Sequence, residues 1–250
     1  MPEQLWFTEL LNRLFAGPVT ALLNALGIKP HYAQAPITKS LAMEVLVVLF
    51  LLTLFILVRS RLSVDNPGAL QHVFEGLHGF IDKQSHEIIG HENRPHIPFL
   101  VVLTLFILCC NLLGLVPSME SPTAVPVVPL GCALVAFVYY QGYGFRQHGI
   151  RYLRQFAGPS IGPWWANFLM GVLMVPIEVV SHLARVLSLT VRLFANMFAG
   201  DMVTLIFFSL VPVAVPVAFM ALHIGVSLIQ TYVFVLLTMV YLAGSVGEAH

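Results

Sequence analysis

The sequence predicts an all-α polytopic membrane protein with about five membrane-embedded helices, the last two long and strongly tilted, plus interfacial amphipathic helices. Three observations predict this fold class. The 250 residues are 58% hydrophobic and only 10% charged, with a mean hydropathy of +0.87, whereas a soluble domain has roughly 25% charged residues. Several apolar runs approach the ~20 residues that cross a ~30 Å hydrocarbon core. The polar residues of the C-terminal third recur at helical spacing within an apolar background.

The chain is interpreted as a single membrane domain over residues 1–250 that begins with an N-terminal segment, 1–40, on the outer side. Its stretch from Glu3 to Leu26 lacks the basic start of a signal peptide, so an interfacial amphipathic helix is expected there. The first span is predicted at residues 41–58, an apolar run that basic residues close.

A helix on the cytoplasmic surface is predicted at residues 67–90. Its apolar side chains recur at helical spacing: Leu70, Val73, Phe74, Leu77, Phe80 and Ile81. Such a helix lies in the membrane interface. Five histidines in this region have neither HxxxH spacing nor a cysteine among them: His72, His78, His86, His91 and His96. No metal site is therefore predicted.

A helical hairpin is predicted at residues 98–145. Its first arm is the apolar run 98–116, and its second arm starts near Pro129, because proline suits a first helical turn. The residues between the arms, 118–129, are expected to form a loop or a partly re-entrant segment. Three cysteines in the apolar runs are interpreted as small buried hydrophobic residues: Cys109, Cys110 and Cys132.

Two long tilted helices are predicted at residues 165–210 and 217–243. The 34 residues 177–210 contain no proline and would form a helix of about 50 Å. The 27 residues 217–243 would form one of about 40 Å. Both exceed a ~30 Å hydrocarbon core and must tilt.

Positive charges predict the orientation. Basic residues follow the first and third spans: Arg59, Arg61, Arg146, Arg151 and Arg154. The short loop after the second span carries Glu120 and no Lys or Arg. Because basic loops stay in the cytoplasm, the N-terminus is expected outside and the C-terminus in the cytoplasm of a bacterial plasma (inner) membrane.

Arg192 is the most unusual residue, because an arginine within a span costs about 2.5–3.5 kcal/mol on insertion scales. Seven residues advance a helix by about 700°, so Glu178, Arg185 and Arg192 lie almost on one line. Other polar residues share this stripe: Ser181, Ser188 and Asn196. One face of this helix is therefore wet or faces protein.

Further polar residues occupy other faces of the long helices. Asp201 lies nine residues beyond Arg192, about 900° around the helix, so it points to the opposite side. His223 and Gln230 form a second polar line in the last helix. A carboxylate, an imidazole and a guanidinium at staggered depths indicate ion conduction. Alternatively, these groups join helices together, or Arg185 and His182 snorkel to the headgroups.

The segment PIEVVSHLARVLSLTVRLFANMFAGD, residues 176–201, resembles subunit a of F-type ATP synthases. HIGVSLIQ, at residues 223–230, and the ending VLLTMVYL support this resemblance, and looser matches occur at NPGALQHVFEGLHGFI, 66–81, and NLLGLVP, 111–117. The resemblance implies a non-catalytic stator that lies against a rotating ring of c subunits. It further implies b-type peripheral stalk subunits and the rest of an ATP synthase complex as partners, within membrane lipid.

The resemblance also implies roles for particular residues. Arg192 matches the arginine that faces the ring carboxylates, and Glu178 matches a residue that borders the cytoplasmic half-channel. Three positions match residues that border an outer aqueous half-channel: Asp201, His223 and Gln230. Asn196 and Ser181, on the Arg192 stripe, complete the candidate ion-translocation residues. Some family members have an acid where Gly114 stands.

A fixed positive charge between two half-channels would block a direct proton leak and favour deprotonation of an approaching carboxylate. The chain has no GxxxxGK or GxGxxG motif, so ATP chemistry is assigned to other subunits, and no cofactor or nucleic acid is expected. The translocated ion is predicted to be H⁺, with Na⁺ left open. A secondary transporter or channel, which would show repeated halves, and a metal or haem enzyme, which needs converging ligands, remain alternatives.

Overall fold

The computed structural model describes residues 6–25, 36–63, 67–90, 93–116, 119–149, 164–210 and 214–246. Across these ranges the regular elements are all helices, and five of them are long and apolar enough to cross a membrane. The predicted fold class, an all-α polytopic membrane protein, is confirmed.

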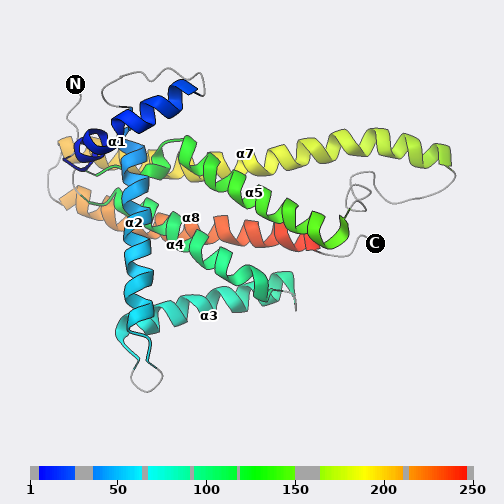
Figure 1. The fold of residues 1–250 in the computed structure, drawn as a ribbon, viewed down its shortest axis with the longest axis horizontal. Coiled ribbons are helices and arrows are strands. Elements are labelled where there is room, and N and C mark those ends of the chain that lie inside the picture. The colour runs from blue at the N-terminus through cyan, green and yellow to red at the C-terminus, as the bar shows by residue number, and fades with distance from the viewer. Residues whose placement is uncertain are drawn as a thin grey trace.

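The first two helices meet at one end of the upright span (Figure 1). Helix α1 covers Trp6–Ala25, and α2, which contains the run predicted as the first span, covers Lys39–Ser60. The Thr38 hydroxyl caps α2 by accepting a hydrogen bond from the Leu41 amide. Asn12 ties α1 to the residue before this cap, because its amide exchanges two hydrogen bonds with the Ile37 backbone, at 2.9 and 3.2 Å.

Helix α3, Ala69–Ile89, lies within the segment predicted as an interfacial helix and ends at Gly90, whose φ of +90° suits glycine. Its buried Ile81 packs against Leu100 and against Val235 and Met239 of the last helix. This contact buries Ile81, whereas Leu70, Val73 and Phe80 of the same apolar face stay exposed. The cytoplasmic location of α3 stays a prediction.

The hairpin consists of α4, Ile97–Leu113, preceded by the 3-10 turn η1, Arg94–His96, and of α5, Val127–His148. Pro129 lies in the first turn of α5, where its missing N–H removes no helical bond. The predicted loop between the arms contains a second 3-10 turn, η2, Pro122–Ala124. This turn contacts α4, α5 and α7, so the loop is folded into the bundle.

Helices α7, Trp164–Leu210, and α8, Ala214–Val246, have 47 and 33 residues. At 1.5 Å per residue they are about 70 and 50 Å long. They run side by side along the longest axis and cross α2 steeply (Figure 1), as expected of strongly tilted helices. Helix α7 continues through Pro176, so it is longer than its proline-free run alone suggests.

The main core lies where α4, α5, α7 and α8 meet. Leu193 and Met197 of α7 are fully buried there with Ile107 of α4, Ala133 of α5 and Phe234 of α8. The burial is uneven, because only 17% of the apolar stretch of α7 is buried, against 44% for α4, α5 and α8. Much of the surface of α7 is therefore open within this chain.

Candidate functional site

Arg192 lies in the second half of α7 with a half-buried side chain. Its Nη2 donates a long hydrogen bond, 3.5 Å, to the Ser188 hydroxyl one turn earlier. In the part of the chain that the structure describes, no ion pair joins Arg192 to a carboxylate. The guanidinium therefore has no counter-charge inside the described bundle.

Small side chains surround Arg192 on the open side of α7. They recur at helical spacing and are exposed: Ala184, Ser188, Ala195 and Ala199. Small residues allow the backbone of another membrane helix to approach closely. This face of α7 is suited to an external helix that reaches the guanidinium.

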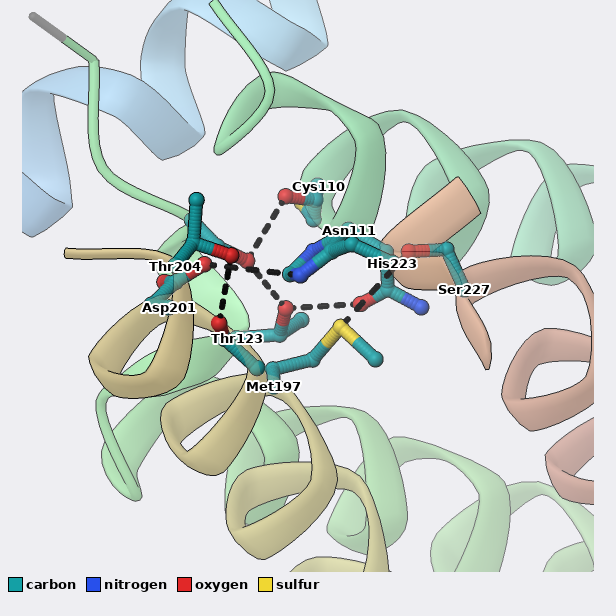
Figure 2. A network of polar contacts seen from close by, with 10 residues as sticks. Cys110, Asn111, Thr123, Met197, Asp201, Thr204, His223 and Ser227 are labelled. Carbon is teal, nitrogen blue, oxygen red and sulfur yellow. Dashed lines mark hydrogen bonds and ion pairs between the residues drawn. The ribbon is translucent and has the colours of Figure 1, made fainter. Parts of the chain in front are cut away.

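Asp201 and His223 meet between α7 and α8, as Figure 2 shows. The Asp201 Oδ1 lies 3.8 Å from the His223 Nδ1, an ion-pair distance when the imidazole is protonated. His223 is nearly fully buried, whereas Asp201 is partly exposed. The structure thus pairs two titratable side chains that the sequence placed on separate helices.

Gly200 makes this pairing sterically possible. A Cβ atom at Gly200 would lie only 2.7 Å from the His223 Nδ1. Any side chain at this position would displace the imidazole, because the ring is buried between the helices. Glycine at 200 is therefore a requirement of the observed His223 position.

Asn196 and Gln230 form a second pair across the same helices. The Asn196 Nδ2 donates a 2.7 Å hydrogen bond to the Gln230 Oε1, and Gln230 is buried. A third contact follows nearby, where the Ser227 hydroxyl lies 3.9 Å from the Met197 sulfur. The predicted residues Asn196 and Gln230 are thus brought together, on the Arg192 side of the Asp201–His223 pair.

A buried network of polar groups lies beside the Asp201–His223 pair (Figure 2). Most of its members were not predicted from the sequence. The Thr123 hydroxyl donates to the Asn111 Oδ1 at 2.6 Å, and the Asn111 Nδ2 donates to the Thr231 hydroxyl at 3.2 Å. Ser121 contacts Thr123 at 2.7 Å and donates to the Cys110 carbonyl at 3.0 Å. The available signal was a pair of hydroxyl residues in a short loop between spans, where polar groups need partners.

Gly114, where some family members have an acid, borders Asp201. A Cβ at Gly114 would lie 3.2 Å from the Asp201 Oδ1 and 3.0 Å from the Ser121 Cβ. The space that a longer side chain would need is already filled by the loop residue Ser121 and by the carboxylate. An acid at 114 would therefore require Ser121 and the Asp201 carboxylate to shift.

Two side-chain nitrogen atoms are buried between α7 and α8. The His223 Nε2 and the Gln230 Nε2 have no hydrogen-bond partner among the residues that the structure describes. Buried polar groups in proteins are nearly always bonded, and ordered water is the usual partner when protein atoms are absent. Both atoms therefore indicate positions for water between α7 and α8.

A different cluster lies towards the start of α7. The Glu178 Oε1 is 3.4 Å from the His182 Nε2, and the His182 Nδ1 is 3.4 Å from the Tyr140 hydroxyl on α5. Ser181 is half-buried on the same part of α7. The sequence left open that His182 snorkels to the headgroups, but its side chain is buried. Arg185 instead lies over the Tyr241 ring, 5.1 Å from its centroid.

Arg192 lies between the two clusters along α7. Glu178 precedes it by 14 residues and Asp201 follows it by nine, which correspond to about 21 and 14 Å. Asp201 points towards α8, whereas Arg192 lies on the open side of α7. The fold and the site together define a polytopic helical membrane protein with ionisable groups at three depths of one span, as in proteins that move ions.

Comparison with known proteins identifies the family. A family model described as "ATP synthase A chain" matches residues 41–243. The chain is 52% identical to "ATP synthase subunit a" of Koribacter versatilis over the full length of both chains. It is 47% identical to the subunit of the same name from Solibacter usitatus, over 96% of this chain and 100% of that one. It is also 40% identical to "ATP synthase subunit a 1" of Syntrophotalea carbinolica, over 82% and 84% of the two chains.

The chain therefore belongs to the ATP synthase subunit a family, and the expected resemblance is confirmed. Together with the five long apolar helices of the described residues, this membership makes the protein an integral membrane subunit of an ATP synthase.

Proposed function

We propose that this protein is the proton-translocating stator subunit of an F-type ATP synthase. In this proposal two aqueous half-channels lead to a rotating ring of c subunits, and Arg192 separates them. The observation that carries the proposal is the position of Arg192. It lies on the open face of α7, between two clusters of titratable side chains, with no carboxylate partner in the described parts of the chain.

The outer half-channel is proposed to run between α7 and α8. Asp201 and His223 supply groups that bind and release protons, 3.8 Å apart. The Nε2 atoms of His223 and Gln230 have no hydrogen-bond partner among the described residues, which supports water along this path. Asn196, which donates to Gln230, then leads towards Arg192. Protons would pass from Asp201 to the ring through these groups and their waters.

The cytoplasmic half-channel is proposed to begin beyond Arg192 in the other direction. Glu178 is partly exposed and lies about 21 Å from Arg192 along α7. Ser181, half-buried one turn nearer, lines the same stretch. Because this cluster and Asp201 lie on opposite sides of Arg192 along the helix, no single aqueous path needs to join them.

Arg192 would act in two ways. Its fixed positive charge repels a proton that would otherwise cross directly between the half-channels. It also stabilises the ionised form of a ring carboxylate that arrives opposite it, so that the carboxylate must release its proton there. Ion flow down the membrane potential, about 2.3 kcal/mol per charge per 100 mV, then supplies work for rotation.

The open face of α7 supports the proposed ring partner. Only 17% of its apolar stretch is buried in this chain, and small exposed residues flank Arg192. An external helix that carries a carboxylate would cover the exposed surface of α7 and would place a negative charge opposite Arg192. The b-type peripheral stalk subunits are proposed to hold this stator against the ring, and ATP chemistry belongs to other subunits of the complex.

We further propose a bacterial inner membrane location with the N-terminus outside and the C-terminus in the cytoplasm. The distribution of Arg and Lys between the loops supports this orientation. It assigns the Asp201 cluster to the outer side and the Glu178 cluster to the cytoplasmic side. The translocated ion is proposed to be H⁺.

The decisive experiment is Arg192→Ala in the whole complex, reconstituted in vesicles. We expect loss of both ATP-driven pumping and ATP synthesis, because each requires the ring carboxylates to deprotonate at this point. Vesicles stripped of the soluble ATPase should show a passive proton leak, because the barrier is gone. Arg146→Ala, which removes an exposed arginine of α5, serves as the control and should leave coupling intact.

The assembly of the subunit is measured in parallel. If Arg192 only joined helices together, its replacement would cause misassembly without a proton leak. A fully assembled Arg192→Ala complex that still couples proton flow to ATP would refute the proposal.

A further inference from the structure

His182 is a buried titratable residue that the two half-channels described above leave unused. It lies on α7 between Glu178 and Arg192, and two polar atoms lie within contact distance of its ring. The Nε2 lies 3.4 Å from the Glu178 Oε1, and the Nδ1 lies 3.4 Å from the Tyr140 Oη. One imidazole thus bridges a partly exposed carboxylate and a buried phenol.

We propose that His182 carries protons in the cytoplasmic half-channel, that it exchanges them with Glu178, and that Tyr140 is the positioning residue that orients its ring. This inference rests on the proposed stator function and adds two residues to it. Neither His182 nor Tyr140 was among the residues assigned to ion translocation from the sequence.

The order of residues along α7 supports a carrier at this position. His182 lies ten residues before Arg192, about 15 Å along the helix, whereas Glu178 lies about 21 Å away. A proton that leaves the ring near Arg192 therefore reaches the depth of His182 before that of Glu178. Without His182, the carboxylate would depend on water alone to cover this interval.

The proton balance needs no change of tautomer. In the resting state we assign the hydrogen to Nδ1, which donates to the Tyr140 oxygen, so that Nε2 is the nitrogen that can accept a proton. A proton arriving through water adds to Nε2 and forms the imidazolium. The Nε2–H bond then breaks as the proton moves to the Glu178 carboxylate, which becomes a neutral acid. Glu178 releases this proton to the cytoplasmic water, and both groups return to their resting charge.

The packing around His182 explains how the ring is held. The Tyr140 ring lies nearly parallel to it, at 29° and 6.2 Å between centroids, and the Phe137 ring meets it edge-on at 6.0 Å. Among the described residues, Glu178 of α7 and Tyr140 of α5 contact the imidazole. Tyr241 of α8 packs against the Tyr140 ring, and Arg185 of α7 lies over Tyr241. Arg185 stays protonated and has no acceptor, so Glu178 is the described carboxylate in contact with the ring that can take a proton from it.

The test is His182→Gln in the whole complex, since glutamine keeps hydrogen bonding at this site but does not carry a proton. Positioned proton-transfer groups contribute ~10²–10⁴-fold, and water can bypass part of this, so ATP-driven pumping should fall by roughly tenfold. The pH profile of the pumping rate should also change shape, because a titrating group has been removed. The control is His78→Gln, which alters an exposed histidine of α3 and should change neither the rate nor the profile.

Two further measurements separate a carrier from a packing residue. If His182 and Glu178 act in series, the His182→Gln, Glu178→Gln double variant should pump no more slowly than the slower single variant. If their roles are independent, the fold-losses in pumping rate of the two single variants should multiply. Small imidazole added to vesicles should partly restore pumping in His182→Gly, because it can occupy the vacated space and carry the proton. A purely structural histidine would show neither behaviour.

A substitution of Tyr140 keeps the test conclusive if the His182 variants fail to assemble. Tyr140→Phe removes only the hydroxyl that orients the ring, and it should slow pumping with an altered pH profile. An assembled His182→Gln complex with the wild-type rate and profile, or a Tyr140→Phe complex that matches the wild type in both, would overturn the inference. The Arg192→Ala experiment tests the stator function separately. The proposed role of His182 and the proposed stator function can therefore be refuted independently.

Discussion

Substitution of Gly200 by alanine tests the proposed outer half-channel through a single methyl group. The new Cβ would lie 2.7 Å from the His223 Nδ1, whereas ordinary van der Waals contacts begin at 3.4 Å. The imidazole must therefore retreat by about 0.7 Å. Because the methyl group projects from α7, this retreat moves the ring away from Asp201, with which it now forms a 3.8 Å contact.

Two opposing energies set the change in stability that Gly200→Ala causes. Alanine improves the helix by about 1 kcal/mol relative to glycine, whereas overpacking a filled site costs about 1–3 kcal/mol. The net cost is small enough for the complex to assemble. Misplacement of a reacting group by about 1 Å can cost 10²-fold in rate, and water can bridge part of the new gap, so proton pumping should fall by roughly tenfold.

The assay is ATP-driven proton pumping in vesicles, normalised to the amount of assembled subunit. Gly225→Ala is the matched control, because Gly225 lies on α8 and an added Cβ there meets no atom within 4 Å. It should leave pumping unchanged. Replacement of His223 by serine in the Gly200→Ala background removes the clash, so the double variant should be less impaired than the two single effects multiplied together.

The reasoning would be refuted by a Gly200→Ala complex that assembles fully and pumps at the rate of Gly225→Ala. Equal losses in both glycine variants would also contradict it, because the effect would then come from the helix rather than from the imidazole.

Three other substitutions test separate parts of the site. Asp201→Leu should slow both ATP-driven pumping and ATP synthesis while assembly continues, and normal pumping in an assembled complex would exclude Asp201 from the path. Glu178→Gln should lower the rate with little change in coupling, so a leaky membrane would contradict its place in the exit path. Asn111→Leu should lower the thermal stability of the subunit, measured by its retention in the complex on heating. It removes the oxygen that accepts from the buried Thr123 hydroxyl, and the loss of such a hydrogen bond costs about 0.5–1.5 kcal/mol.

The spans could be predicted from sequence because the signals are local. Hydropathy identified the run at 41–58, which the structure extends at both ends to Lys39–Ser60. Proline chemistry indicated the start of α5 near Pro129. The helix predicted at 165–210 includes Pro176, and α7 continues through this proline. Membrane helices tolerate such a break because neighbouring groups satisfy the freed carbonyl.

The loop between the hairpin arms could be predicted only in part. A turn between two spans was evident, but its polar residues gave no sign of their partners. Thr123 bonds to Asn111 because η2 folds back against α4, and Ser121 then fills the space beside Gly114. Such a fold-back depends on tertiary packing, which residue spacing along one chain does not encode.

The sequence by itself determined that the protein is a helical membrane protein, that Arg192 is the anomalous charge of its longest helix, and that Asp201 lies on another face from Arg192. These results follow from composition and from the 3.6-residue period, which act within a single helix. Only the tertiary structure decided which groups meet. Asn196 bonds to Gln230 across 34 residues, Tyr140 contacts His182 across 42, and Asn111 bonds to Thr231 across 120. Each contact depends on how two helices cross and rotate against each other, and side-chain packing sets that geometry.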